Sequence, residues 1–310
     1  MSVSYLKKAG KRPETGEGET EAIVKTILQD IESGREDKAL EYARRLDNYE
    51  GDVLLTDEQI EAVRKSVPQA VKDDIAYAAD NVAKFAEAQR DSMQGFEIEL
   101  RPGLFTGQVL RPMQSVGCYV PGGRYAHIAT AIMTIVTAKV AGVKSVTACS
   151  PPRPGQGINP HILYTMDYCG ADRILAMGGV QGIAAMAYGL FDIPPVDILV
   201  GPGNRFVAEA KRILFGKIGI DVFAGPTEIA IIADRTADPA LVAQDLVSQA
   251  EHGLDSPAWL ITDDEVLANK VAELMPRVID QLPEATANTA RTSWADYGEI
   301  VLCDTRDEMV

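Results

Sequence analysis

The stretch Val116-Gly-Cys-Tyr-Val-Pro-Gly-Gly123 predicts a short apolar strand that ends in a glycine-rich turn. The same arrangement recurs at Met177-Gly-Gly-Val180 and at Val200-Gly-Pro-Gly-Asn204. Glycine at a strand-to-helix turn lets backbone N–H groups approach a ligand closely, and the N-terminus of the following helix favours an anion. One such turn alone is most often structural, but three in one region favour a dinucleotide or phosphate ligand.

Short apolar strands alternate with helical patterns around these turns. The predicted strands are Val116–Val120, Ser145–Cys149, Arg173–Met177, Val196–Val200, Glu228–Ala233, Ala258–Thr262 and Glu299–Cys303. The predicted helices cover residues 128–141, 161–169, 180–189, 204–215 and 239–251. Strands that alternate with helices of this length indicate βαβ units and largely parallel sheets. The sequence therefore predicts an α/β fold.

The region before Val116 is predicted to be mostly helical. Isoleucines recur every four residues over 23–31, and Thr56 with Gln59 forms a capping box ahead of an apolar helical pattern. The helical pattern continues over residues 71–94. Residues 96–100 then alternate between apolar and polar side chains, which predicts a strand. An N-terminal helical region is therefore expected ahead of the alternating part.

Length and composition restrict the class of protein. The 310 residues exceed what one hydrophobic core usually organises, so two domains are expected. The sequence is 46% hydrophobic and 24% charged, as in ordinary soluble globular proteins. Its net charge of −15 argues against a nucleic-acid partner, because phosphate backbones repel an acidic surface. These properties favour an enzyme that acts on a small molecule.

The N-terminus and the cysteines indicate the compartment. Residues 1–15 are polar and contain Gly and Pro, so a loose arm without a signal peptide is expected. The chain also lacks an apolar run of about eighteen residues, and no membrane partner is expected. Four cysteines are scattered without CxxC spacing, which argues against a disulfide framework or a zinc ribbon: Cys118, Cys149, Cys169 and Cys303. We therefore expect a cytoplasmic protein with cysteines in its core.

Two further positions allow alternative interpretations. The turn at Gly201-Pro-Gly203 does not complete a GxGxxG motif, because Phe206 stands at the last position, so a dinucleotide would bind without the usual fingerprint. Thr227 precedes an apolar strand, where its hydroxyl either holds a substrate or bonds the local backbone. The residues alone leave both interpretations open.

One of the three histidines, His252, stands three residues after Gln249 near the end of the predicted helix Ala237–Glu251. This spacing places both side chains on one helical face. Imidazole is the commonest nitrogen ligand of zinc, and a Gln oxygen is an uncommon one. A histidine that neutralises the helix C-terminus beside a solvated glutamine is the simpler interpretation. Judged by the residues alone, the simpler interpretation is preferred.

Taken together, these segments resemble the histidinol dehydrogenase family. The matching stretches follow the family order over residues 116–252, with weaker similarity on both sides. They are Val116-Gly-Cys-Tyr-Val-Pro-Gly-Gly123, Ala138-Lys-Val-Ala-Gly-Val143, Gly178-Gly-Val-Gln-Gly-Ile-Ala-Ala-Met-Ala-Tyr-Gly189, Val200-Gly-Pro-Gly-Asn204, Ala224-Gly-Pro-Thr-Glu228 and Asp245-Leu-Val-Ser-Gln-Ala-Glu-His252. The resemblance implies oxidation of a primary alcohol through an aldehyde to a carboxylate, with two NAD and one zinc.

The resemblance also implies roles for particular residues. Tyr119, Gln181 and Asn204 match NAD-contacting positions, and Thr227 stands where the family usually has a substrate-binding serine. Gln249 and His252 match two zinc ligands that also contact substrate, which reverses the preference above. In such a site zinc would hold the substrate hydroxyl and orient the carbon for loss of hydride.

The resemblance implies a domain division as well. We expect a loose arm at 1–15, then a first α/β domain from residues 16–118 and 229–310 that includes the N-terminal helices. A second domain, 119–228, is expected to be inserted into it. Both domains are expected to be Rossmann-like with mostly parallel sheets, in a homodimer that shares its active sites.

One branch of the family, the sulfopropanediol dehydrogenases, fits better than the enzymes of histidine biosynthesis. The stretches that carry this likeness are Ser4-Tyr-Leu-Lys-Lys8, Phe85-Ala-Glu-Ala-Gln89 and Gly122-Gly-Arg-Tyr-Ala-His127. Many histidinol enzymes carry neutral residues in place of Arg124 and His127. A guanidinium repels the ammonium group of histidinol but attracts a sulfonate. We therefore expect Arg124 or His127 to face an anionic group of a sulfonated diol, while a solvated Arg124 is the alternative.

The family's acid–base pair, an adjacent Glu and His, is expected beyond residue 310, as are the remaining zinc ligands. We therefore expect the 310 residues to be a fragment that lacks the base for hydride chemistry. Three alternatives remain: a histidinol-specific enzyme, a truncated non-catalytic NAD-binding or assembly relative, and an aldehyde dehydrogenase that uses Cys118 as a nucleophile.

Overall fold

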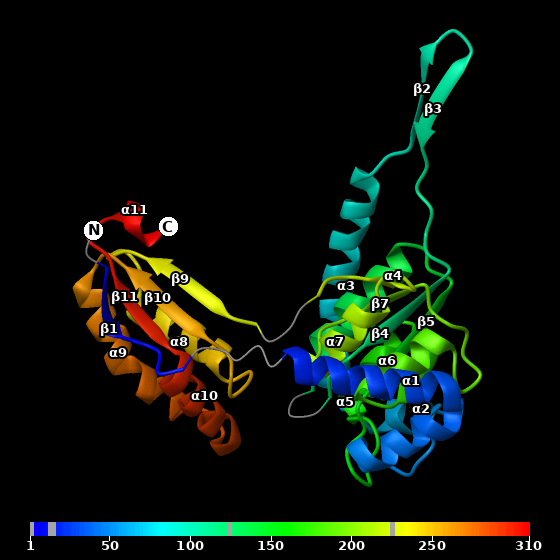
Figure 1. Ribbon diagram of the computed structural model, residues 1–310, viewed down its shortest axis with the longest axis horizontal. Coiled ribbons are helices and arrows are strands. Elements are labelled where there is room, and N and C mark those ends of the chain that lie inside the picture. The colour runs from blue at the N-terminus through cyan, green and yellow to red at the C-terminus, as the bar shows by residue number, and fades with distance from the viewer. Residues whose placement is uncertain (1–2, 12–16, 123–125, 224–226) are drawn as a thin grey trace. The chain divides into compact units, whose positions relative to one another are not determined.

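The computed structural model describes residues 3–11, 17–122, 126–223 and 227–310. The chain forms two compact units: a larger one of residues 17–225 and a smaller, discontinuous one of residues 1–16 and 226–310 (Figure 1). This division differs from the expected one, in which residues 16–118 belong with 229–310. The N-terminal helices belong instead to the larger unit, because they share their cores with the sheet of residues 115–220.

The larger unit is built on five parallel strands in the order β6-β5-β4-β7-β8. These strands are β4 (Ser115–Tyr119), β5 (Ser145–Ser150), β6 (Arg173–Ala176), β7 (Ile198–Val200) and β8 (Gly219–Ile220). The chain moves outward from β4 through β5 to β6 and then crosses back to β7 on the other side of β4. The gap between β4 and β7 is therefore a topological switch point, where ligands of α/β sheets collect.

Helices cover both faces of this sheet (Figure 1). One layer contains α1 (Glu17–Tyr42), α6 (Gly179–Tyr188) and α7 (Arg205–Leu214). The other contains α2 (Asp57–Ser66), α3 (Gln69–Ser92), α4 (Ile128–Val140) and α5 (Pro160–Tyr168). Side chains alternate along β4, so Cys118 packs in the second layer while Tyr119 packs in the first. This alternation turns Tyr119 toward α1 and α6.

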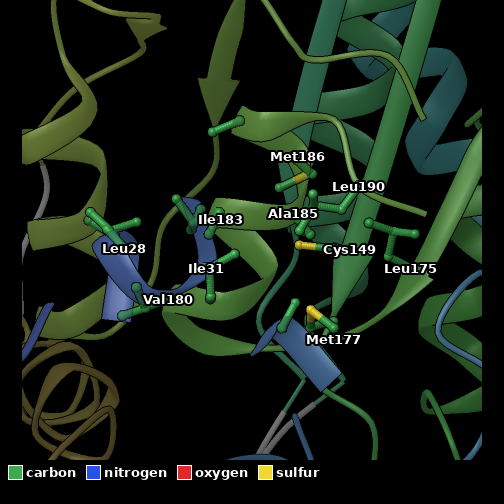
Figure 2. Close-up of a cluster of buried hydrophobic side chains, with 14 of the residues drawn as sticks. Leu28, Ile31, Cys149, Leu175, Met177, Val180, Ile183, Ala185, Met186 and Leu190 are labelled. Carbon is green, nitrogen blue, oxygen red and sulfur yellow. The ribbon is translucent and has the colours of Figure 1, made fainter. Parts of the chain in front are cut away.

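The core between α1 and α6 lies on the first face of the sheet. Figure 2 shows Leu28 and Ile31 of α1 beside Val180 and Ile183 of α6. Ile31 and Ile183 are fully buried, and full burial of an isoleucine contributes about 1.5–3 kcal/mol. This packing fixes α1 against α6.

A kink and a π-helical turn end the first helix. Arg35 has a φ of 50° inside α1, and its guanidinium donates to Tyr188 O at 3.0 Å and Gly189 O at 3.1 Å. These carbonyls belong to the C-terminal end of α6, where a cation is favoured. The π-helix η1 (Ala43–Asp47) follows α1, and Asn48 ends it in the left-handed region. Together these features direct Asp47 back toward the sheet.

The capping box and the strand predicted between residues 56 and 100 are both present. Thr56 and Gln59 form the capping box of α2, with Thr56 Oγ1 accepting from the Gln59 N–H. After α3 the chain forms an antiparallel hairpin of β2 (Phe96–Arg101) and β3 (Leu104–Gln108). Every residue of both strands is exposed, and Figure 1 shows the hairpin extending away from the helices of its own unit. The hairpin therefore adds nothing to the core of the unit.

The smaller unit contains a four-stranded sheet in the order β1-β11-β10-β9. Strands β9 (Ile229–Ala233), β10 (Ala258–Thr262) and β11 (Glu299–Leu302) are parallel, and β1 (Ser4–Lys7) pairs antiparallel with β11. The prediction of a loose N-terminal arm is therefore wrong for residues 4–7. Short polar segments of this kind form strands when an edge supplies the hydrogen bonds.

Helices α8 (Pro239–Ala250), α9 (Glu265–Ile279) and α10 (Glu284–Tyr297) pack in the core of this unit, and α11 (Arg306–Met309) follows β11. Both units thus combine helices with parallel strands, which confirms the predicted α/β class. Within the described part of the chain, no helix has the length and apolar character needed to span a bilayer.

Candidate functional site

A cavity of about 570 Å³ lies at the switch point of the larger unit. The three predicted dinucleotide positions, Tyr119, Gln181 and Asn204, all line it. Tyr119 ends β4, Gln181 lies in the first turn of α6, and Asn204 precedes α7. The carboxyl ends of parallel strands meet at one edge of the sheet, so segments far apart in sequence contribute to one cavity.

Tyr119 supports the turn that follows β6. Only 3% of the residue is exposed, and its hydroxyl oxygen accepts a hydrogen bond from the Gly179 N–H at 3.1 Å. Burial raises the pKa of the Tyr119 hydroxyl well above its ordinary value of 10.0, so the side chain stays neutral at physiological pH. Tyr119 therefore offers an uncharged aromatic surface to the cavity.

The glycine pair Gly178-Gly179 has a geometric cause. Gly179 has a φ of +53°, which glycine adopts readily. A Cβ on Gly179 would lie 2.9 Å from Gln181 Oε1, and a Cβ on Gly178 would lie 2.8 Å from Pro151 Cβ. The turn therefore needs glycine so that the Gln181 side chain can fold back over it.

Gln181 is only 1% exposed, and Asp47 holds its amide group. Asp47 Oδ2 accepts from Gln181 Nε2 and from the Gly178 N–H, both at 3.0 Å. Gln181 Oε1 has no hydrogen-bond partner among the described residues, although it is buried. Buried polar atoms are almost always bonded, so an unpartnered acceptor beside a cavity indicates a missing donor.

Asp47 itself lines the cavity, and sequence analysis missed it. Burial raises the pKa of its carboxyl above the ordinary value of 3.8, while the bonds from Gly178 and Gln181 act in the opposite direction. No local pattern singles out Asp47 in the sequence, because its partners lie more than a hundred residues away. The π-helical turn that ends at Asp47 is seen only in the structure, and such turns are frequent at functional sites.

Asn204 begins the helix on the other side of the cavity. Its Oδ1 accepts from the Phe206 N–H at 3.0 Å and from the Val207 N–H at 3.1 Å, which makes it the N-cap of α7. The side-chain NH₂ group of Asn204 is the donor that remains for a ligand. The N-terminus of α7 also favours an anion at this edge of the cavity. The helix after this glycine turn thus begins at a side-chain cap, without the last glycine of a GxGxxG motif.

An ion pair between a buried lysine and an exposed aspartate fixes the turn between β7 and α7. Lys211, 3% exposed, pairs with Asp221 and donates to Gly201 O at 2.8 Å. Asp221 Oδ2 accepts from the Gly201 N–H at 2.8 Å. Gly201 has a φ of +112°, and a Cβ there would lie 2.2 Å from Tyr119 O. Lys211 and Asp221 thus bond to the carbonyl and the N–H of Gly201 and hold this turn close to β4. The sequence did not predict this ion pair.

The smaller unit brings together two of the predicted substrate residues. Gln249, in the last turn of α8, donates from Nε2 to Thr227 O at 2.6 Å and to Thr227 Oγ1 at 3.0 Å. Because Nε2 bonds to Thr227, Oε1 is the atom of Gln249 that could coordinate a metal ion. Thr227 is exposed, and its hydroxyl is therefore both bonded locally and accessible.

His252 lies just outside the helix that was predicted to reach Glu251. Helix α8 ends at Ala250, and the His252 N–H bonds to Gln249 O at 3.1 Å. The side chain is exposed. Because the helix ends before His252, helical spacing alone does not place its side chain beside that of Gln249.

The donor set of the smaller unit is incomplete for zinc. Zinc sites need about four ligands, and Gln249 with His252 offers an amide oxygen and one imidazole. Across the ranges that the structure describes, no three His, Cys, Asp or Glu side chains gather in a way that would hold a metal ion. The described residues therefore fit, at most, part of a zinc site.

Arg124 lies outside the described residues. His127 precedes α4 and is half-buried. Cys118 is fully buried on β4, and burial raises the pKa of its thiol to about 12. A nucleophile must be accessible and ionised, so the alternative that uses Cys118 as a nucleophile is wrong. The four cysteines are buried and free of disulfides, as predicted.

Known proteins resemble this chain over nearly its whole length. The sequence profile of the histidinol dehydrogenase family matches residues 10–310. The sulfopropanediol 3-dehydrogenase of Ruegeria pomeroyi is 55% identical over 309 residues, which cover 100% of this chain and 71% of that protein. The histidinol dehydrogenase of Geobacter sulfurreducens is 40% identical over 301 residues, or 96% of this chain and 69% of that protein.

A solved structure supports the fold. The crystal structure of histidinol dehydrogenase from Elizabethkingia anophelis has a TM-score of 0.87 and 34% identity to this chain. The match covers 96% of this chain and 68% of that one.

Proposed function

The chain belongs to the histidinol dehydrogenase family, and we propose that it binds NAD in the switch-point cavity and uses it to oxidise a primary alcohol. The single observation that carries this proposal is a buried acceptor without a partner among the described residues, Oε1 of Gln181, on a residue that lines a cavity of about 570 Å³. NAD offers N–H and O–H donors to such an atom. Bound NAD would supply the hydride acceptor.

The surrounding residues suit the parts of a dinucleotide. The neutral ring of Tyr119 provides an apolar surface for a base or a ribose. The Asn204 amide and the N-terminus of α7 suit a phosphate. Arg45 lines the same cavity and adds a positive charge. Polar groups of these kinds on an apolar wall are typical of cofactor sites.

We propose zinc as the second cofactor, with Gln249 Oε1 and the His252 imidazole as two of its ligands. The other ligands would come from residues that the described structure does not supply, so no chemical step is assigned to zinc here. Dialysis against a chelator should abolish alcohol oxidation by the product of the whole gene, and added Zn²⁺ should restore it. Unchanged activity after the metal is removed would contradict this part.

We propose a sulfonated diol as the substrate. The alcohol would pass through an aldehyde to a carboxylate, with two hydrides transferred to two NAD and one oxygen atom taken from water. Two features support this choice: the 55% identity to a sulfopropanediol 3-dehydrogenase and the cationic Arg124 in the first glycine turn. Oxidation of L-histidinol is the alternative, because relatives at 40% identity are histidinol dehydrogenases.

Formation of NADH, followed at 340 nm, tests the reaction. The product of the whole gene is assayed with sulfopropanediol and with histidinol, and the 310-residue chain is assayed beside it. We expect NADH from the whole gene product, at a higher kcat/KM with sulfopropanediol. We expect none from the 310 residues, because their described side chains fit at most part of a zinc site. A whole gene product that binds NAD but oxidises neither alcohol would favour a non-catalytic relative.

Arg124 provides a sharper test of the substrate. Arg124→Ala should raise the KM for sulfopropanediol about tenfold, because a charge-assisted hydrogen bond to the sulfonate would be lost. The KM for NAD should stay unchanged. Arg153→Ala removes a charge from another loop of the same unit and serves as the matched control. Equal KM values for sulfopropanediol in both variants would contradict the role of Arg124.

We further propose a cytoplasmic homodimer with shared active sites, as the family resemblance implies. Sedimentation of the whole gene product at micromolar concentration would give the mass of a dimer. A monomer that retains full activity would contradict this assembly.

A further inference from the structure

Asp47 reaches across the larger unit to the turn that begins α6. Its Oδ2 atom accepts from the Gly178 N–H and from Gln181 Nε2, both at 3.0 Å. The residue ends the π-helical turn η1, after the segment that packs on α6 through the core of Figure 2. Two separate groups on one turn are thus held by one carboxylate oxygen.

The carboxylate decides which end of the Gln181 amide faces away from Asp47. An ionised carboxylate only accepts hydrogen bonds, so it binds the NH₂ end of the amide and not the oxygen. Gln181 Oε1 is then left as the acceptor, buried and without a partner in the described structure. Gln181 folds over Gly179, where an added Cβ would lie 2.9 Å from Oε1, so glycine leaves the room that this placement of the side chain needs.

We propose that Asp47 is a positioning residue of the cofactor site: it fixes the Gln181 amide so that Oε1 accepts a hydrogen bond from an N–H or O–H donor of the dinucleotide. The proposal rests on the proposed function, because it assumes that NAD enters this cavity. Asp47 does not need to touch the cofactor. It acts through Gln181 and through the Gly178 turn.

An asparagine at position 47 weakens this control of the Gln181 amide. Its neutral oxygen can still accept from the Gly178 N–H and from Gln181 Nε2, but both hydrogen bonds are weaker without the carboxylate charge. The Gln181 amide is then held less firmly, and its bond to NAD is weakened. We expect Asp47→Asn to raise the dissociation constant for NAD about tenfold.

Asp52→Asn is the matched control. Asp52 is an exposed aspartate five residues away, and it also accepts from a glutamine amide, Gln59 Nε2, at 3.4 Å. It does not line the switch-point cavity. The substitution removes the same charge, and the dissociation constant for NAD should stay unchanged.

The test is a double-mutant cycle read by calorimetric titration of the 310-residue chain with NAD. Gln181→Met keeps the length of the side chain and removes its hydrogen bonds. If Asp47 acts through Gln181, Asp47→Asn weakens NAD binding in the wild type and has little further effect in the Gln181→Met background. An equal loss in both backgrounds would indicate a general structural role and overturn the proposal, as would equal affinity of Asp47→Asn and Asp52→Asn.

Failure of the proposed function gives a different result, namely no NAD binding by the wild-type chain. If Asp47→Asn does not fold, hydrogen exchange of the Gln181 side-chain amide in the wild-type protein, followed by NMR, replaces the cycle. We expect slow exchange of one Gln181 side-chain N–H before and after NAD is added. Fast exchange in the free protein would overturn the proposal, because Asp47 would not be holding the amide.

Discussion

At the scale of single residues, the side chains around the switch-point cavity divide into two kinds. Gln181 and Asn204 offer hydrogen-bonding atoms to a ligand, whereas Asp47 and Lys211 hold the turns on which those atoms depend. A buried acceptor without a partner costs about 1–3 kcal/mol. A ligand that bonds to Gln181 Oε1 removes this cost, so the free protein already contains part of the driving force for binding.

Gly201 and Gly216 have similar backbone angles, so alanine substitutions at the two positions can distinguish the cost of backbone strain from the cost of a steric clash. Gly201 has a φ of +112° and Gly216 a φ of +96°, but only at Gly201 would a Cβ meet the backbone, 2.2 Å from Tyr119 O. Gly201→Ala should lower the free energy of unfolding by about 2–4 kcal/mol. Gly216→Ala should lower it by about 1 kcal/mol, from the backbone angle alone. Urea unfolding measures both, and equal losses would refute the close approach.

Asp47 should make stability depend on pH. Burial raises the pKa of its carboxyl above 3.8, so ionisation is harder in the folded chain than in the unfolded chain. Its contribution to stability is therefore present below pH 3.8 and is lost as the pH rises through the folded pKa. The free energy of unfolding of the wild type, minus that of Asp47→Asn, should fall as the pH rises from 3.8 toward neutrality. A difference that rises with pH would show that the folded pKa is lowered instead.

At the scale of elements, the N-termini of α6 and α7 meet the same cavity, and each is held differently. Helix α6 begins at a glycine pair supported by Tyr119 and Asp47. Helix α7 begins at a side-chain cap, Asn204. The cap satisfies two N–H groups of the helix and leaves an amide donor for the ligand, so one residue serves both stability and binding.

A comparison of two N-cap residues, Asn204 and Thr56, should distinguish the effect on stability from the effect on ligand binding. Asn204→Ala and Thr56→Ala each remove a helix N-cap, and each should cost about 1 kcal/mol in the free energy of unfolding. Only Asn204→Ala should also weaken NAD binding, because Thr56 does not line the switch-point cavity. Chemical unfolding and calorimetry of both variants measure the two effects. Equal NAD affinities would contradict a binding role for Asn204.

The hairpin of β2 and β3 should be dispensable for stability. All of its strand residues are exposed, so its removal uncovers little of the core. Replacing residues 96–108 by a short glycine linker should leave the midpoint of thermal unfolding of the purified chain unchanged. A marked fall would show that the hairpin packs against part of its own chain.

Across the whole molecule, most helices and strands could be predicted from the sequence, because the patterns that indicate them are local. The capping box at Thr56 and the apolar strands before the glycine turns matched the structure closely. The edge strand of residues 4–7 was missed because its hydrogen bonds come from β11, almost three hundred residues away. The expected division near residue 118 failed for a similar reason, since packing assigned the N-terminal helices to the larger unit.

The candidate site was predictable only in part. Tyr119, Gln181 and Asn204 were found through the family resemblance, and they line one cavity because the strand order brings their turns to the switch point. Asp47 and the Lys211–Asp221 pair were not found. Asp47 contacts Gln181 over a separation of 134 residues, which no sequence spacing encodes. Lys211 and Asp221 are only ten residues apart, but their contact depends on the packing of α7 beside β8.

A crystal structure of the 310-residue chain with NAD would show whether the switch-point cavity is the cofactor site. We expect NAD in the cavity lined by Tyr119, Gln181 and Asn204, with one of its donors bonded to Gln181 Oε1 and with Asp47 still bonded to Gln181 Nε2. NAD bound elsewhere on the chain, or a cavity that stays empty at saturating NAD, would contradict this expectation.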